Sequence, residues 1–175
     1  TWGVSACMME RGHVLNGRDA LIGEIGHAVI SNTGPVVCAC GKRGCLESLV
    51  SIDNVRHILG TLGDATLGTG APVTFERLFA ASEREDGRAR RAVAYLAHCF
   101  AVALHNLSLT YNQELVVFQG DFARADAYFD SCLKGELGEF HYYPNGVYFD
   151  IAYDRRDLRL LAAQSDAAVL QRKYF

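Results

Sequence analysis

The sequence predicts an α/β fold, and three observations support that prediction. Short apolar runs of strand character alternate with segments of helical period along the chain. Half of the 175 residues are apolar, which is enough for a core of domain size. No segment approaches the roughly 18 consecutive apolar residues of a membrane-spanning helix, so we expect no membrane partner. The length fits one domain or one lobe of a two-lobed protein.

The first third of the chain is expected to combine short strands with a cysteine-rich loop. Two strands around a turn at Arg11-Gly12 and a third short strand are expected at residues 3–10, 13–17 and 27–31. Gly34-Pro35 then interrupts regular structure ahead of the cysteines. A short helix is expected from residue 45, and Ser51 could begin a second helix that ends near residue 59.

The remaining two thirds show helices that alternate with strands. A glycine-rich loop is expected at residues 60–72, and Thr74 is placed to cap the helix that follows. In the longest expected helix, residues 88–111, apolar side chains recur about every 3.6 residues, at Val93, Leu96, Ala97, Phe100, Leu104 and Leu107. The other expected elements are a helix at 75–85, a strand at 114–120 with both faces covered, a helix at 122–137, a strand at 147–153 and a helix at 156–171.

Composition argues against several classes of protein. The formal net charge is −3, and the basic run 88-RARR-91 stands beside no nucleic-acid-binding motif, so we interpret it as the solvated face of a helix. The six cysteines are unevenly spaced, unlike the disulfide framework of a small secreted protein, and no signal peptide is evident. We therefore expect a cytoplasmic, reducing environment. The chain starts at Thr1 rather than Met, which indicates a piece of a longer protein.

One histidine and three cysteines form a candidate metal site, at His27, Cys38, Cys40 and Cys45. Zinc favours four such ligands in a tetrahedron, and a site closed by four protein ligands is structural rather than catalytic. The glycines at 41 and 44 supply the backbone angles that a tight metal loop needs, and the charges at 42 and 43 would favour ionised thiols. The alternatives are free thiols in a turn or a single disulfide.

The same stretch resembles the signature of the ROK family, which comprises bacterial sugar kinases and sugar-responsive repressors. The resemblance rests on 23-GEIGH-27 and 38-CACGKRGCLE-47, and weaker similarity extends over nearly the whole chain. It implies an actin-like ATPase, ribonuclease-H-like lobe with a mixed sheet flanked by helices and a zinc-binding loop. It also implies that residues 1–175 form a single C-terminal lobe, without the N-terminal lobe, its Asn-Asp catalytic motif or a winged helix.

The resemblance implies a sugar site beside structural Zn(II). By their places in the motif, Glu24, His27 and Glu47 are expected to contact sugar hydroxyls. Carboxylates accept hydrogen bonds from hydroxyls, and an imidazole that binds a metal through one nitrogen can donate from the other. The alternative for Glu24 is a surface charge at a strand end. For Glu47 it is a carboxylate favoured by the dipole of the helix that it begins.

Departures from the family pattern favour sensing over phosphoryl transfer. Ser5 and Cys7 stand where the glycine-rich hairpin of the family has glycines, Gln119-Gly120 replaces paired glycines, and Ala162 replaces another glycine. Each change adds bulk where a nucleotide would be expected, and the chain shows no catalytic base. We therefore expect the effector lobe of a sugar-responsive regulator of the xylose-repressor type, and no enzyme.

This regulator would respond to a small sugar effector, contact DNA only through a missing N-terminal domain, and form a homo-oligomer. Two alternatives stay open. The first is a C-terminal fragment of an ATP-dependent sugar kinase that acts on a hexose or an N-acetylhexosamine. The second is a zinc-stabilised assembly domain without a ligand. The sequence does not identify the sugar.

Overall fold

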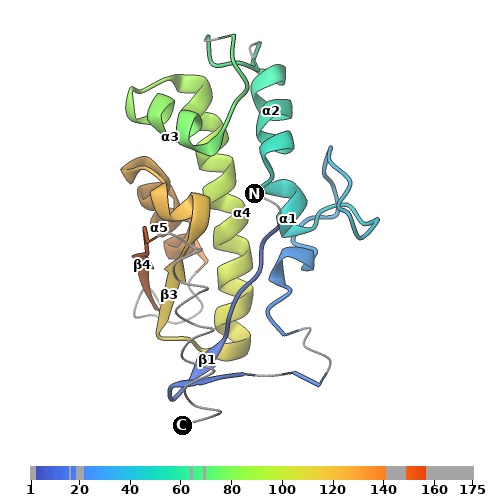
Figure 1. The fold of residues 1–175 in the computed structure, drawn as a ribbon, viewed down its shortest axis with the longest axis vertical. Helices are drawn as coiled ribbons and strands as arrows, with labels where there is room; N and C mark the ends of the chain where they lie inside the picture. Colours follow the sequence, from blue (N-terminus) through green and yellow to red (C-terminus); the bar gives the residue numbers. More distant parts are fainter. Residues whose placement is uncertain are drawn as a thin grey trace.

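The computed structural model describes residues 3–15, 17–18, 22–63, 65–68, 70–140 and 149–156. Figure 1 shows the long helix α4 running through the middle of the molecule. Helices α2 and α3 lie at one end of α4, and α5 lies with strands β3 and β4 along one side of it. The N-terminal segment and the cysteine-rich loop lie on the other side, next to helix α1.

Helix α4, Gly87–Tyr111, is the central element of the core. Asp86 caps it, because its carboxylate accepts hydrogen bonds from the backbone N–H groups of Arg88 and Ala89. The helix ends at Asn112, which adopts the left-handed conformation with φ of 48°. Five of the six apolar residues predicted to form one face are buried, and Leu107 is partly buried. The helical period therefore predicted the core face correctly.

Within the described residues, α4 is long and apolar enough to cross a membrane by length and composition. However, 56% of its most apolar window is buried inside the protein, as expected for the core helix of a globular domain. Helices α1 (Leu46–Leu49), α2 (Ile52–Thr61), α3 (Phe75–Glu83) and α5 (Ala127–Glu139) all pack against it. Its apolar character is thus explained by packing.

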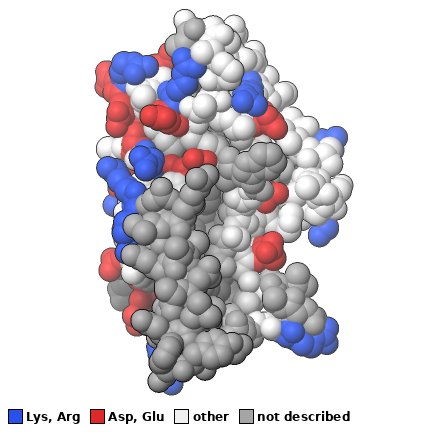
Figure 2. All heavy atoms as spheres, viewed as in Figure 1, with Lys and Arg blue, Asp and Glu red and all other residues white. Residues whose placement is uncertain are grey.

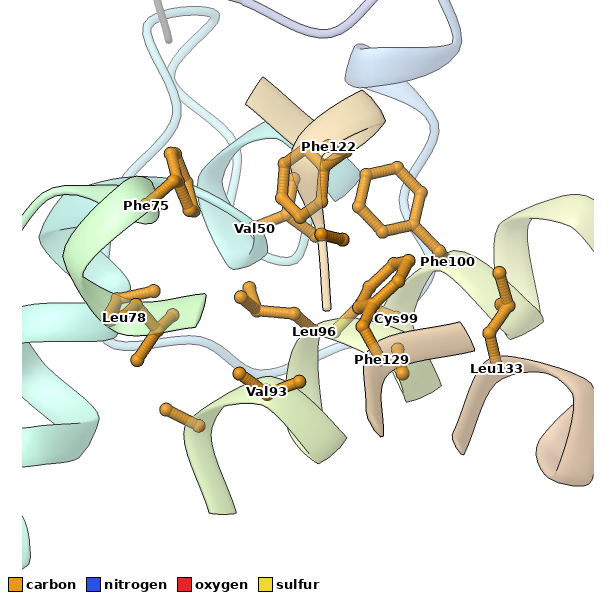
Figure 3. Packing of buried hydrophobic residues seen from close by; sticks show 14 of the residues in the cluster. Val50, Phe75, Leu78, Val93, Leu96, Cys99, Phe100, Phe122, Phe129 and Leu133 are labelled. Atoms are coloured by element: carbon orange, nitrogen blue, oxygen red, sulfur yellow. The ribbon is translucent and has the colours of Figure 1, made fainter. Parts of the chain in front are cut away.

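An aromatic cluster joins α4 to the elements around it (Figure 3). The ring of Phe100 on α4 lies 4.6 Å from that of Phe122 and 6.1 Å from that of Phe129, centroid to centroid. Phe122 belongs to the short 3₁₀ helix η2, Gly120–Arg124, and also lies 4.9 Å from Phe75 of α3. Tilted and edge-to-face rings at these distances are the favoured arrangement of aromatic side chains. The cluster fixes α3, α5 and η2 on α4.

The strands form two separate two-stranded sheets in the described part of the chain, rather than the single mixed sheet that we expected. Strand β3, Leu115–Phe118, pairs in parallel with β4, Asp150–Tyr153. Strands β1, Met9–Glu10, and β2, His13–Val14, form an antiparallel hairpin. The predicted turn at Arg11-Gly12 is confirmed, and both residues have the positive φ that a tight hairpin turn requires.

Two strand predictions were wrong. Residues 27–31 do not form a strand: the 3₁₀ helix η1, Ile25–His27, is followed by extended chain with a single bridge from Val29 to Cys45. The backbone of these residues is hydrogen-bonded to the cysteine-rich loop instead of to a neighbouring strand; for example, the Ile30 N–H donates to the Gly44 carbonyl. Strand β3 is also not covered on both faces, because Leu115 is 52% and Val117 is 46% exposed.

The helix predictions were more accurate. Four helices match expectation closely, with Ser51 capping α2 and Thr74 capping α3 through their hydroxyls. The helix predicted at 122–137 is instead divided into η2 and α5, because Asp126 accepts a bond from the Phe129 N–H and starts a new helix. Apart from Arg156, the helix predicted at 156–171 lies outside the described residues, as do the first two residues of the strand predicted at 147–153.

Candidate metal centre and its surroundings

The four predicted metal ligands come together in one cluster. The ligand atoms of His27, Cys38, Cys40 and Cys45 all lie within 4.8 Å of one another. Nδ1 of His27 lies 3.4 Å from Sγ of Cys38, and the sulfurs of Cys40 and Cys45 are 3.6 Å apart. In a tetrahedral site with metal–sulfur bonds of about 2.3 Å, neighbouring ligand sulfurs are roughly 3.8 Å apart. The cluster could therefore bind a metal ion, and its cysteines form no disulfide.

Tight backbone turns bring the thiols together. The N–H of Cys38 donates to the carbonyl of Lys42, and the N–H of Gly41 donates to the carbonyl of Cys38. Gly44 passes so close to the preceding loop that a Cβ atom there would lie 1.7 Å from the Ser31 carbonyl oxygen. Its φ of 78° also disfavours any residue other than glycine. We predicted that the glycines at 41 and 44 supply the unusual backbone angles of this loop, and both have positive φ.

The thiols of Cys40 and Cys45 differ in acidity. The backbone N–H of Lys42, followed by the Cys38 side chain, lowers the pKa of Cys40 to about 7. Burial, followed by the Cys40 side chain, raises the pKa of Cys45 to about 12. The side-chain charges of Lys42 and Arg43, which we expected to favour the thiolates, are not among the causes of either shift. The Arg43 guanidinium instead donates to the carbonyls of residues 34 and 35 and ties the loop together.

The N-terminal segment is bound to the predicted Glu-x-Gly-His element. The Gly26 N–H donates to the Val4 carbonyl, and the Ala6 N–H donates to the Gly23 carbonyl. A Cβ atom on Gly26 would lie 2.2 Å from the Val4 carbonyl oxygen, so a side chain at 26 would force these backbones apart. Residues 3–8 alternate between exposed and half-buried, as in an extended strand.

Two of the three predicted sugar contacts adjoin the same thiol. His27 faces Cys38 through Nδ1, and Oε1 of Glu47 lies 4.0 Å from the Cys38 sulfur. The other Glu47 oxygen, Oε2, accepts a hydrogen bond of 3.1 Å from the Val4 N–H. Sequence reasoning missed this contact, since the two residues are 43 positions apart and no motif joins them. Glu24 is exposed, and its carboxylate has no hydrogen bond or ion pair with a described residue.

A hollow of about 210 Å³ opens beside Glu47. It lies between the N-terminal residues Gly3 and Val4 and residues 36–39 of the metal loop, with Asp53 at the start of α2 on its border. Neither Glu24 nor His27 lines it. The structure thus places Glu47 between the candidate metal centre and a small open space with both apolar and carboxylate walls.

A polar network closes the edge of the sheet where β3 and β4 both end. Asp154, directly after β4, accepts hydrogen bonds from the backbone and guanidinium of Arg156, the closest at 2.7 Å. The Gln119 amide, directly after β3, donates to the same carboxylate at 3.4 Å. The Arg156 side chain, followed by its backbone N–H, holds the pKa of Asp154 well below its usual range. Carboxyl edges of parallel strands are common ligand sites, so these side chains occupy a position where a ligand would be expected.

Three other positions were expected near a nucleotide, and the structure describes two of them. Ser5 and Cys7 are exposed on the N-terminal segment, on the side opposite to the half-buried Val4 and Ala6. Their side chains therefore lie on the solvent side of that segment. Ala162 lies outside the described residues.

Comparison with known proteins identifies relatives among sugar kinases. The sequence profile of the ROK family matches residues 2–149. A glucokinase of Halalkalibacterium halodurans is 28% identical over 177 residues, which cover 96% of this chain and 51% of the glucokinase. An N-acetylmannosamine kinase of Yersinia pestis is 30% identical over 135 residues, which cover 77% of this chain and 43% of the kinase. The chain spans about half the length of these curated relatives.

Solved structures with the same fold include both a kinase and a regulator. A ROK hexokinase from Thermus thermophilus matches with a TM-score of 0.69 at 25% identity, over 85% of this chain and 48% of the hexokinase. A ROK-family transcriptional regulator, a homologue of the E. coli MLC protein, matches with a TM-score of 0.68 at 25% identity, over 87% of this chain and 40% of the regulator. Overall similarity of structure therefore does not separate the two functions.

Proposed function

Since the chain belongs to the ROK family, we propose that it supplies the metal-bearing wall of a sugar site. The observation that carries this proposal is the joint position of His27 and Glu47 against Cys38, one ligand of the candidate metal centre. A metal that orders the loop would fix both side chains at once. Glu24, exposed at the start of η1, is the third proposed sugar contact.

We propose Zn(II) as the metal, held by His27, Cys38, Cys40 and Cys45. The donor set supports zinc, because three thiolates and one imidazole are among its common structural ligands. Bound through Nδ1, His27 would keep Nε2 for a hydrogen bond to a ligand. Glu47 would offer a sugar hydroxyl both lone pairs of Oε1 and the one at Oε2 that the Val4 N–H leaves available. The zinc would be structural, with no role in a reaction step.

For the whole protein, a sugar kinase is the better supported activity, in place of the regulator favoured by the sequence. The support is that the curated relatives described above are a glucokinase and an N-acetylmannosamine kinase. On this proposal the sugar is a hexose or an N-acetylhexosamine. The nucleotide and the catalytic base would require residues beyond the 175 described by this sequence, since the relatives are about twice as long.

A sugar-responsive regulator is the second candidate, because one local feature favours it. The network of Gln119, Asp154 and Arg156 fills the carboxyl edge of the parallel strands and presents a carboxylate there. A nucleotide phosphate that approached this edge would have to displace these paired side chains, which together add no net charge there. Under this candidate, DNA contact would come from a separate domain and homo-oligomerisation would accompany it, and both remain proposals.

Sugar binding is tested by calorimetric titration of the full-length protein with glucose and N-acetylmannosamine. We expect saturable binding that Glu24→Gln and Glu47→Gln each weaken at least about tenfold, since each removes a charged acceptor. Glu10→Gln, on the exposed β1–β2 hairpin, is the matched control and should bind as the unmodified protein does. Absence of binding to both sugars, with intact metal content, would exclude this proposal and favour an assembly domain.

The two whole-protein functions are separated by adding ATP and Mg²⁺ to the sugar-bound protein. A kinase forms ADP and sugar phosphate in equal amounts. A regulator binds sugar without turnover, and the sugar changes the affinity of the protein for DNA.

A further inference from the structure

A second hollow, apart from the metal loop, lies beside α3, at the end of the molecule that also holds α2 (Figure 1). It has a volume of about 200 Å³ and is formed by one face of α3 and by residues 66 and 67 of the loop that precedes it. Its lining residues are Thr66, Leu67, Val73, Arg77, Ala80, Ala81 and Arg84. Figure 2 shows basic side chains gathered over this end, with acidic ones between them.

Two arginines border this hollow. Arg77, on α3, and Arg84, the C-cap residue directly after it, are seven positions apart, so their Cα atoms are about 10 Å apart along the helix and lie on the same side of it. Ala80 and Ala81 lie between them, and their short side chains leave the space open. No acidic residue of the described chain lines the hollow. The site therefore presents two positive charges without a built-in negative partner.

The guanidinium groups keep donors for a ligand. Nη1 of Arg77 donates to the Pro72 carbonyl at 3.1 Å, which orients the side chain and leaves its other N–H groups available. The Arg84 side chain makes no hydrogen bond or ion pair with any described residue, whereas the guanidinium groups of Arg88 and Arg90 nearby are paired with Asp86 and Glu85. An arginine with two or more N–H groups available can bind a phosphate through two parallel hydrogen bonds.

The remaining wall is apolar and is held in an uncommon conformation. Leu67 is partly buried against the core and has a φ of 54°, which is costly for a residue with a branched side chain. Such backbone conformations concentrate at ligand clamps and functional loops. Leu67 and Val73 lower the local dielectric constant beside the arginines, which strengthens an interaction with an anion.

We propose that this hollow binds a small phosphate monoester. A phosphate monoester carries close to two negative charges at neutral pH, which matches the charges of Arg77 and Arg84. The volume is below the roughly 300–1,000 Å³ of sites for drug-sized ligands, so the organic part must be small. The site is separate from the proposed sugar site, and this inference does not rest on the proposed function.

The test is calorimetric titration of the full chain with glycerol 3-phosphate, with glycerol and inorganic phosphate as comparison ligands. We expect saturable binding of both phosphates, no binding of glycerol, and tighter binding at pH 7.5 than at pH 5.5, because the phosphate takes its second charge near a pKa of about 6. Arg84→Gln should weaken binding at least about tenfold.

Arg91→Gln is the matched control, because Arg91 is an exposed arginine on α4 that does not line the hollow. It should bind the phosphates as the unmodified chain does. Arg84 holds no other described residue in place, so its replacement should leave the thermal midpoint unchanged. Absence of saturable binding to glycerol 3-phosphate would overturn the proposal. So would an Arg84→Gln variant that binds as tightly as the Arg91→Gln control.

Discussion

The helical core and the cysteine-rich loop of this protein are held together by different means. Around α4, the largest side chains are fully buried: Phe129 and Leu96 are each 0% exposed. In the loop from residue 30 to 44, by contrast, Val37 is 50% exposed. The backbone of this loop is held in place by hydrogen bonds, by close contacts at glycine and by the cysteine–histidine cluster. The core thus depends on apolar area removed from water, and the loop depends on backbone geometry and its ligand set.

The two regions should therefore respond to different perturbations. Loss of apolar volume should weaken the core and leave the loop intact until the whole domain unfolds. A change of backbone freedom or of the metal ligands should disturb the loop and leave α4 protected.

Replacement of Phe129 by alanine should have the largest effect. The ring is fully buried on α5 and contacts Phe100 and Phe122 across the aromatic cluster. We expect the free energy of unfolding to fall by about 3–5 kcal/mol, because the lost ring leaves a cavity. Denaturant unfolding followed by circular dichroism measures it. Leu115→Ala, at a side chain that is 52% exposed, is the control and should cost much less.

Replacement of Gly44 by alanine should have the next largest effect, and it should be local to the metal loop. The added Cβ would overlap the Ser31 carbonyl at a backbone φ of 78°. We expect a loss of about 2–4 kcal/mol, from the left-handed conformation and the overlap together. Gly41→Ala is the matched control, since φ is 83° but nothing lies within 4 Å of the new Cβ. Equal effects of the two variants would contradict the close contact at Gly44.

Replacement of Asp86 by alanine should have a smaller effect that depends on pH. The backbone N–H of Ala89 is the first of several groups that lower the pKa of this carboxylate in the folded protein. The charged form is therefore favoured on folding, and its stabilisation is present above a pH of about 4 and is lost as the pH falls further. At pH 7 we expect Asp86→Ala to cost about 0.5–2 kcal/mol.

Asp86→Asn separates the hydrogen bonds of the cap from its charge. Asparagine is also a good helix cap, so this variant should retain most of the stability at pH 7 and should lose the dependence on acid pH. Thermal unfolding measured between pH 3 and pH 7 compares the three proteins. An Asp86→Ala variant that is destabilised equally at pH 3 and pH 7 would contradict a role for the charge.

The core could be predicted from the sequence because its signals are local and periodic. The recurrence of Val93, Leu96 and Phe100 identified the buried face of α4 without any knowledge of its partners. Asp86, which caps α4, lies between two helices predicted from their apolar residues and was not identified as a cap. Asp126, the cap of α5, was missed for the same reason: a polar residue inside a long helical pattern can start a helix as well as interrupt one.

The surroundings of the metal loop could be predicted only in part. The donor residues and the need for glycine at 44 followed from spacing and backbone chemistry. The error at residues 27–31 arose because the short apolar run looks like a strand, whereas its partner is a loop rather than a sheet. The contact between Glu47 and Val4 depends on tertiary packing between distant segments, and no local pattern encodes it.

We propose that the cysteine–histidine cluster is a closed zinc site that orders the wall of a sugar pocket. The most direct test is elemental analysis of the full chain after purification from zinc-replete medium, together with a Cys45→Ser variant. We expect about one zinc ion per chain, and clearly less than one in the variant, whose α4 remains folded. A chain that contains no metal, yet has its full secondary structure and an ordered loop, would contradict the claim.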